Sequence, residues 1–177
     1  GAVGSAVGQF ARQLGASKVI GSAGTDEKVE RLMELGFDSA INYREGNLSA
    51  QLKEAAPEGI DLYFDNVGGE HLEAAIARMN EFGRVAMCGA IAQYNNTQKP
   101  SGPRNLALAI GKCLTLRGFV LGKYLDAAPE FQERMAPLVL NGNIKYDVTT
   151  RHGIEAMPEA FLELFTGGNT GKMVVEM

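Results

Sequence analysis

The sequence alternates between short apolar runs rich in β-branched residues and longer segments with apolar residues at helical spacing. This alternation predicts strand–helix–strand units, in which consecutive strands lie parallel and helices cover the sheet. Because such crossovers are almost always right-handed, helices are expected on both faces of one twisted sheet. The sequence therefore predicts an α/β fold with a Rossmann-type, doubly wound parallel sheet.

Gly15, Gly36 and Gly142 are expected to end helices, and Thr25 is expected to be the N-cap of the second helix. On that second helix, Val29, Met33 and Leu35 are expected to face inward with Leu32. The expected helices cover residues 6–14, 26–35, 48–56, 70–80, 105–113, 129–141 and 158–165. The expected strands cover residues 18–23, 39–43, 60–67, 83–89, 115–121 and 172–176. A polar loop is expected over residues 93–104.

The segment from Ile144 onward does not continue the alternation of strands and helices. Residues 144–150 and 172–176 are extended in character, but the helix between them is short. We therefore divide the chain into a nucleotide-binding domain, 1–143, and a C-terminal segment, 144–177. The final strand is expected to pair outside the main sheet or outside this chain, because an uncovered strand edge promotes aggregation.

Composition excludes several classes of protein. Hydrophobic residues make up 45% of the 177 residues and charged residues 21%, which is enough for one packed domain. A net charge of −4 without a basic block argues against a nucleic-acid partner. No apolar run approaches the roughly 20 residues that span a bilayer, and the N-terminus does not resemble a secretory signal.

The cysteines and histidines do not form a metal-binding motif. Cys88 and Cys113 lie in apolar stretches without a CxxC or other ligand spacing, so both are expected to be reduced core thiols of a cytoplasmic protein. His71 and His152 are far apart in the sequence and are expected to be surface or capping residues. No metal ion is expected.

The chain opens on Gly1-Ala2-Val3-Gly4, directly before a helix. Two glycines at this spacing match the second half of the GxGxxG fingerprint, in which the backbone approaches a pyrophosphate at a helix N-terminus. A simple glycine-rich helix start is the alternative. The first glycine and the strand before it would precede residue 1, so the chain is expected to be part of a longer protein.

The end of the expected strand 18–23 indicates which dinucleotide would bind. NAD sites usually place an acid there, about 20 residues after the glycines, to bind the ribose 2′-hydroxyl. Here no acid occurs before Asp26, and Lys28 lies within reach of a 2′-phosphate. Lys28 could also be a solvated helix lysine, but the missing acid favours NADP.

Two further strand ends carry candidate ligand-binding residues. Asn66 precedes Gly68 and Gly69, so it could bind a cofactor ribose or amide, or could simply belong to a β-turn. The segment from Cys88 to Asn95 could line the nicotinamide end, with Tyr94 projecting into the cleft or packing as an ordinary loop residue.

The sequence lacks the signature motifs of several enzyme classes. No tyrosine is followed four residues later by lysine, which argues against a short-chain dehydrogenase. GxSxG, HExxH and GxxxxGK[ST] are also absent. A methyltransferase would share the glycine-rich turn, but it normally has an acid at the end of the second strand.

A series of motifs resembles one branch of the medium-chain dehydrogenase/reductase superfamily, across essentially the whole chain and in family order. The branch comprises the zinc-independent prostaglandin and leukotriene reductases, the curcumin reductases and the plant double-bond reductases. The matching motifs are Gly1-Ala2-Val3-Gly4-Ser5, Asp26-Glu27-Lys28, Leu35-Gly36-Phe37-Asp38, Asn42-Tyr43, Tyr63-Phe64-Asp65-Asn66-Val67-Gly68-Gly69, Cys88-Gly89-Ala90-Ile91, Arg117-Gly118-Phe119-Val120 and Gly168-Asn169-Thr170-Gly171-Lys172.

The resemblance implies NADPH-dependent reduction of the C=C bond of α,β-unsaturated ketones or aldehydes. It assigns pyrophosphate to Gly1, Ala2, Val3 and Gly4, and the 2′-phosphate to Lys28. It places Tyr94 beside the nicotinamide and the substrate carbonyl, as the catalytic residue. The remaining cofactor residues that it implies are Tyr43, Asn66, Cys88, Gly89, Ala90, Ile91, Phe119, Val120, Leu121 and Asn169.

Family members also carry an N-terminal GroES-like domain that forms the other wall of the substrate cleft, and we expect that domain to lie outside this sequence. The segment 144–177 resembles the part that returns to that domain, and the full-length form is expected to be a homodimer. Without that domain, the chain alone is expected to be inactive or to be the ordered part of a longer protein. A quinone reductase of the same superfamily and a non-catalytic NADP-binding protein remain alternatives.

Overall fold

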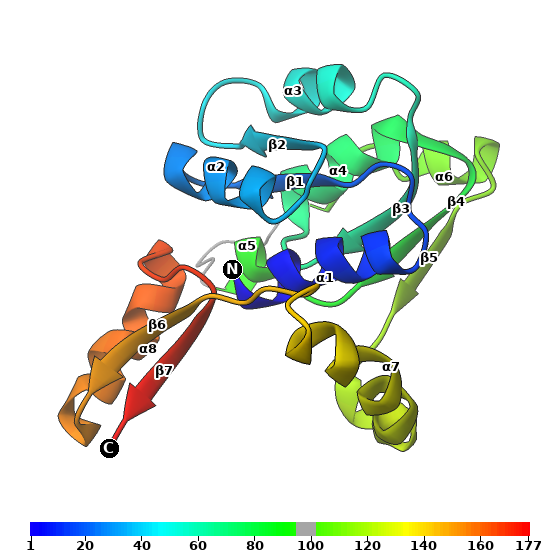
Figure 1. Ribbon diagram of the computed structural model, residues 1–177. Helices are drawn as coiled ribbons and strands as arrows, with labels where there is room; N and C mark the ends of the chain where they lie inside the picture. The colour runs from blue at the N-terminus through cyan, green and yellow to red at the C-terminus, as the bar shows by residue number, and fades with distance from the viewer. Residues whose placement is uncertain (95–101) are drawn as a thin grey trace. The chain divides into compact units, whose positions relative to one another are not determined.

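The computed structural model describes residues 1–94 and 102–177 (Figure 1). Residues 95–101, which belong to the predicted loop 93–104 and include Asn95, lie outside the described residues. The helices are α1 Ala2–Gln13, α2 Asp26–Glu34, α3 Leu48–Ala55, α4 Gly69–Arg78, α5 Ile91–Tyr94, α6 Ala107–Gly111, α7 Ala128–Leu140 and α8 Met157–Thr166. The strands are β1 Ile20–Ala23, β2 Ser39–Asn42, β3 Ile60–Asp65, β4 Met79–Met87, β5 Thr115–Gly118, β6 Val148–His152 and β7 Lys172–Glu176.

The chain forms two compact units. Unit 1 contains residues 1–42 and 130–177, and unit 2 contains residues 43–129. Within the described residues, every strand pair in either unit is parallel, as the alternation of strands and helices predicted. The division at residues 143 and 144 that we drew from the sequence stays a prediction.

In unit 1, β1 pairs with β2 in register from Ile20 opposite Ser39 to Ala23 opposite Asn42. The core beside this pair consists of four buried residues, Val19, Leu32, Leu35 and Phe37. Gly8 in α1 makes room for the last of them, because a Cβ there would lie 2.0 Å from Cζ of Phe37. The small residue thus lets α1 approach the phenyl ring closely.

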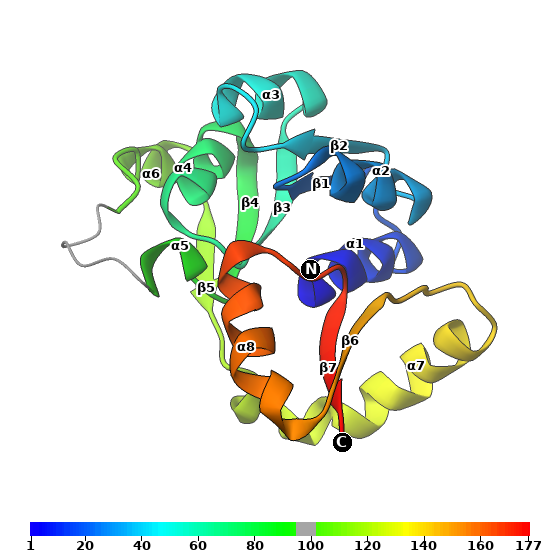
Figure 2. The ribbon, with the colours of Figure 1, turned by 90° about the vertical axis from the view of Figure 1, so that its left-hand side faces the viewer.

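The second sheet of unit 1 pairs β6 with β7, side by side with α8 (Figure 2). The final strand therefore pairs outside the sheet of β1 and β2, but with a partner from this chain. The segment before β6 is fixed to α1 by the buried side chain of Gln9, which both donates to and accepts from the backbone of Lys145 at 2.8 Å. Sequence reasoning did not identify this buried amide.

In unit 2, the strand order is β3-β4-β5. α4 covers this sheet with apolar residues at helical spacing, and the buried core consists of Leu72, Ile76, Met79 and Val85. Since all three strands run in the same direction, their carboxyl ends lie at one edge of the sheet. Asn66, Cys88 and Phe119 each directly follow a strand at that edge.

Several side chains are more exposed than their local sequence predicted. Met33 is 45% exposed, so the prediction that it faces inward is wrong. The prediction that Cys88 and Cys113 are core thiols is also wrong, because both are free and exposed. Cys88 lies beyond the end of β4, and Cys113 lies in the turn before β5, where φ is +52°.

Most predicted element boundaries are within a few residues of the observed ones. The largest differences are α1, which already begins at Ala2, and β4, which already begins at Met79. Among the described residues, no helix combines the length and apolar character that crossing a bilayer requires.

Candidate functional site

In unit 1, the start of α1 presents an open backbone. Gly1 is the N-cap, the first turn contains no acidic residue, and a Cβ built at Gly1 or Gly4 would meet nothing within 4 Å. The first N–H groups of any helix lack partners within the helix and favour an anion. Residues Gly1 to Gly4 therefore leave the start of α1 open, and their role in binding a pyrophosphate stays a prediction.

Lys28 lies in the first turn of α2, whose N-cap Thr25 accepts a hydrogen bond from the backbone N–H of Lys28 at 3.4 Å. Its half-buried side chain extends to α8, where the ammonium donates to the carbonyl oxygen of Gly167. The first acid after β1, Asp26, accepts a hydrogen bond from Nδ2 of Asn42 at 2.8 Å. In unit 1, the cation of Lys28 therefore follows β1, and no acidic residue occupies the end of that strand.

Asn169 belongs to the same loop as the carbonyl that Lys28 contacts. Its Nδ2 donates to the carbonyl oxygen of Gly171 at 2.7 Å. Gly171 has φ +68°, and a Cβ there would lie 2.0 Å from the backbone oxygen of Asp147. The fold therefore brings together two predicted cofactor residues, Lys28 and the loop of Asn169, that are far apart in the sequence.

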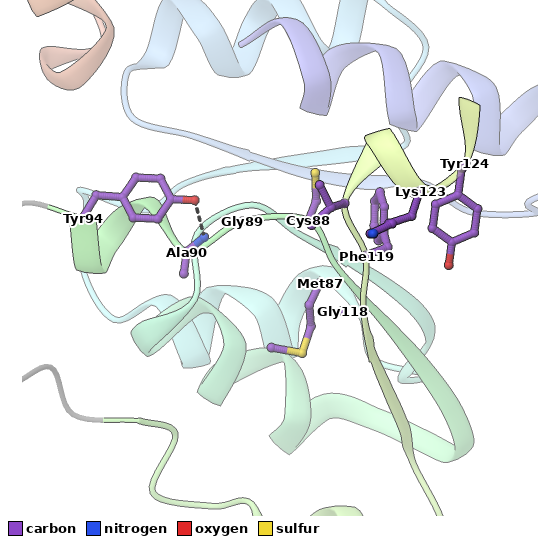
Figure 3. A pocket seen from close by; sticks show the side chains of 10 residues that line it. Met87, Cys88, Gly89, Ala90, Tyr94, Gly118, Phe119, Lys123 and Tyr124 are labelled. Carbon is purple, nitrogen blue, oxygen red and sulfur yellow. Dashed lines mark hydrogen bonds between the residues drawn. The ribbon is translucent and has the colours of Figure 1, made fainter. Parts of the chain in front are cut away.

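In unit 2, a pocket of about 600 Å³ opens at the carboxyl ends of β4 and β5 (Figure 3). Its lining residues are Met87, Cys88, Gly89, Ala90, Tyr94, Gly118, Phe119, Val120, Lys123 and Tyr124. Six of these lining residues are ones that the family resemblance assigns to cofactor binding or catalysis. Four others in this unit, namely Tyr43, Asn66, Ile91 and Leu121, lie outside the lining.

Tyr94 ends the short helix α5 and is 63% exposed. Its phenolic oxygen accepts a hydrogen bond from the backbone N–H of Ala90 at 3.2 Å (Figure 3). This contact uses a lone pair of the oxygen, so the O–H group keeps its own hydrogen to donate. Gly89 permits the arrangement, because a Cβ there would lie 3.2 Å from both Oη of Tyr94 and the backbone oxygen of Asn66.

Tyr43 packs edge-to-face on His71, with ring centroids 4.9 Å apart. Nε2 of that histidine is buried and has no hydrogen-bond partner among the described residues. Burial lowers the pKa of His71, and the carboxylates of Asp65 and Glu70 oppose this shift only in part. His71 lies in the first turn of α4 and is half-buried, so it is less exposed than expected of a surface residue because its ring packs against Tyr43.

Sequence reasoning overlooked Asp65, the last residue of β3, which is fully buried. Its Oδ1 accepts hydrogen bonds from the hydroxyl of Tyr63 at 3.0 Å and from the N–H groups of Val67 and Gly68, both at 2.9 Å. Burial, and then the carboxylate of Asp65, raise the pKa of Tyr63. An aspartate directly before an Asn-x-Gly turn is the available sequence signal, because its side chain can bond the turn N–H groups.

The parallel strand pairs, the glycine-led helix and the pocket at the strand ends are features of a Rossmann-type nucleotide-binding protein. The family model described as "Zinc-binding dehydrogenase" matches residues 2–141. The chain therefore belongs to the zinc-binding dehydrogenase family. Across the described residues, no three His, Cys, Asp or Glu side chains gather as a metal site.

The chain is 45% identical to a "2-alkenal reductase (NADP(+)-dependent)" from Nicotiana tabacum, covering 99% of the chain and 51% of the relative. It is 47% identical to "Prostaglandin reductase 1" from Bos taurus, covering 99% and 54%. Its fold matches the crystal structure of CurA from Vibrio vulnificus in complex with NADPH, with a TM-score of 0.93, 38% identity, and coverage of 100% and 54%. The predicted family resemblance and the Rossmann-type fold are confirmed, and the chain spans about half the length of these relatives.

Proposed function

We propose that the chain is the nucleotide-binding part of an NADPH-dependent reductase of the C=C bond in α,β-unsaturated ketones or aldehydes. One observation supports this proposal above all others, namely the hydroxyl of Tyr94 in a pocket at the strand ends. Ligands of parallel α/β proteins bind at this edge. The relatives that are named as alkenal and prostaglandin reductases support the same reaction class.

The residues fit NADPH. The open backbone of Gly1 to Gly4 would hold the pyrophosphate, and the cation of Lys28 would hold the 2′-phosphate. The remaining cofactor residues that we propose are Ala2, Val3, Tyr43, Asn66, Cys88, Gly89, Ala90, Ile91, Tyr94, Phe119, Val120, Leu121 and Asn169. When bound, the cofactor supplies a hydride to the β-carbon of the substrate.

Tyr94 would stabilise the charge that this reaction creates. As the β-carbon is reduced, negative charge builds on the carbonyl oxygen of the substrate. The O–H group of Tyr94 is free to donate to that oxygen, because Ala90 already occupies one lone pair of the phenol. The α-carbon then takes a proton from water or from Tyr94.

Two measurements on the full-length protein test this function. Titration should show that NADPH binds more tightly than NADH, and an alkenal should be reduced with oxidation of NADPH. Equal affinity for the two cofactors would overturn the cofactor assignment. Turnover of a quinone without turnover of any alkenal or enone would favour the alternative of a quinone reductase, and no turnover at all would favour a non-catalytic NADP-binding protein.

Replacing Lys28 by alanine should weaken NADPH binding by about 10- to 100-fold, because a charged hydrogen bond contributes about 1.5–3 kcal/mol. NADH lacks the 2′-phosphate, so its binding should change far less. The ratio of the two dissociation constants, measured by fluorescence titration, isolates the effect. Lys53→Ala removes the same charge from the exposed face of α3 and serves as the control. An unchanged ratio in the Lys28 variant would contradict the assignment.

The segment 144–177 is proposed to belong to the catalytic domain of the longer protein. A cytoplasmic location is proposed because both cysteines are free. A homodimeric full-length form is proposed on the family resemblance alone. Sedimentation of the full-length protein tests the last of these directly.

A further inference from the structure

Two acidic side chains lie against the loop 167–171, which joins α8 to β7 in unit 1. A Cβ built at Gly171 would lie 2.6 Å from Cβ of Asp147, and one built at Gly168 would lie 3.2 Å from Oε2 of Glu163. The loop itself contains no charged residue. The negative charge beside it therefore comes from α8 and from the segment before β6.

The same loop is contacted by Lys28, the residue that we propose to hold the 2′-phosphate. The ammonium of Lys28 donates to the carbonyl oxygen of Gly167. Burial, and then this ammonium, lower the pKa of the amino group of Gly1, whereas the carboxylate of Asp147 opposes that shift. The start of α1 therefore lies within electrostatic range of both Lys28 and Asp147.

An unpaired carboxylate at Asp147 would favour the wrong dinucleotide. In NAD sites an acid at the strand end binds the ribose 2′-hydroxyl, and its charge would repel a 2′-phosphate. Residues 1–25 contain no acid, but the fold brings Asp147 to this region from a distant part of the sequence. A strand end without an acid therefore favours NADPH only if the charge of Asp147 is neutralised.

Arg31 binds the carboxylate of Asp147 through two hydrogen bonds. Nε donates to Oδ2 at 2.9 Å, and Nη2 donates to Oδ1 at 2.8 Å. Two parallel bonds of this kind are the strongest geometry for an arginine and a carboxylate, and both side chains are half-buried. Arg31 lies one turn after Lys28 on α2, so the two cations share a face of this helix. Nη1 of Arg31 also donates to Oε2 of Glu34 at 2.7 Å.

The second acid beside the loop is paired in the same way. Nε of Arg151 donates to Oε1 of Glu163 at 3.2 Å, and Nη2 donates to Oε2 at 2.7 Å. Both carboxylates that lie against the loop are thus bound by an arginine, so they add little net negative charge beside Lys28.

From these contacts we propose that Arg31 favours NADPH over NADH, because it neutralises an acid that the fold brings beside the proposed 2′-phosphate position. The inference rests on the proposed function, since it takes Lys28 as the residue that binds the 2′-phosphate. Arg31 acts through Asp147 and not on the reacting atoms, so it is a positioning residue. Without Arg31, the charge of Asp147 would oppose NADPH more than NADH, which lacks the 2′-phosphate.

The test measures the dissociation constant of NADH divided by that of NADPH, by fluorescence titration of the full-length protein. Arg31→Gln should lower this ratio by about three- to fivefold, which is the size expected for a partly exposed pair of charges. The loss should shrink at 0.5 M NaCl because salt screens the charge of Asp147. Arg31→Lys should keep the native ratio, since it keeps the cation. Because the readout is a ratio within one variant, a general loss of cofactor affinity does not affect it.

A second substitution separates the effect of charge from that of loop structure. Asp147→Asn should keep the ratio at or above its native value, because it removes the acid and leaves the cation of Arg31. Arg31→Gln combined with Asp147→Asn should restore the ratio to within about twofold of the native value. Arg134→Gln is the matched control. It removes the arginine of an exposed ion pair with Glu130 on α7 and should leave the ratio unchanged.

The outcomes separate this inference from the proposed function. If Arg31→Gln keeps the native ratio while Lys28→Ala lowers it, the inference is wrong and the cofactor assignment stands. If Asp147→Asn alone lowers the ratio, or the double variant stays as low as Arg31→Gln, the ion pair serves the structure of the loop and the inference is again wrong. If the native protein does not prefer NADPH, the proposed function itself fails, and the inference fails with it.

Discussion

Replacing Tyr94 by phenylalanine is expected to lower kcat for an alkenal by about 10²- to 10³-fold in the full-length protein. This is the usual cost of removing one donor aimed at a developing oxyanion. The loss should fall mainly on kcat, because the hydroxyl acts on charge that develops during the reaction. Steady-state kinetics with saturating NADPH would measure it, and circular dichroism would confirm that the variant is folded.

Tyr146→Phe is the matched control for this substitution. Tyr146 is 71% exposed and lies before β6, outside the pocket lining, so the loss of its hydroxyl should leave kcat within about twofold of the native value. If Tyr94→Phe also stays within that range, Tyr94 is not the donor. The backbone N–H groups at the pocket would then be the next candidates.

Replacing Asp65 by alanine should lower the free energy of unfolding of the full-length protein by about 3–5 kcal/mol. The substitution removes the acceptor of three hydrogen bonds and leaves the buried donors of Tyr63, Val67 and Gly68 without it. The turn that follows β3 should loosen at the same time, so the KM for NADPH should rise. Urea denaturation followed by circular dichroism would give the free energy.

Asp65→Asn is the informative comparison, because it keeps a carbonyl oxygen that can replace Oδ1. We expect this variant to lose about 1–2 kcal/mol, clearly less than the alanine variant. Equal losses in the two variants would mean that the negative charge, rather than the acceptor geometry, stabilises the turn. A loss below about 1 kcal/mol for alanine would contradict the structural role of Asp65 altogether.

The features that sequence predicts well are local ones. Thr25 is the N-cap of α2 because its hydroxyl accepts a hydrogen bond from the first turn, a contact within four residues. β7 begins and ends where the apolar run 172–176 does. The candidate residues that follow β3, β4 and β5 could be predicted to share one edge of the sheet, because the strands are parallel and parallel strands end at the same edge.

The features that sequence missed depend on contacts between distant segments. Gln9 is buried because the backbone of Lys145 satisfies both ends of its amide, and nothing near residue 9 indicates that partner. Cys88 has an apolar neighbourhood in the sequence but emerges beyond the end of β4, so its thiol is exposed. Burial is a property of the packed layers, and hydrophobicity along the chain predicts it only for residues inside an element.

The ammonium of Lys28 donates a hydrogen bond to the carbonyl oxygen of Gly167 in unit 1, so the 2′-phosphate that we propose for Lys28 would have to replace this contact. A phosphate that takes the ammonium must compete with a carbonyl at the end of α8, so the observed affinity is a difference between two interactions. If a phosphate took the ammonium, the carbonyl oxygen of Gly167 would lose its charged hydrogen-bond donor. The loop that contains Asn169 would then lose one contact with α2. Amide hydrogen exchange at residues 167–171 should therefore respond to the cofactor, although this loop lies about 140 residues along the chain from Lys28.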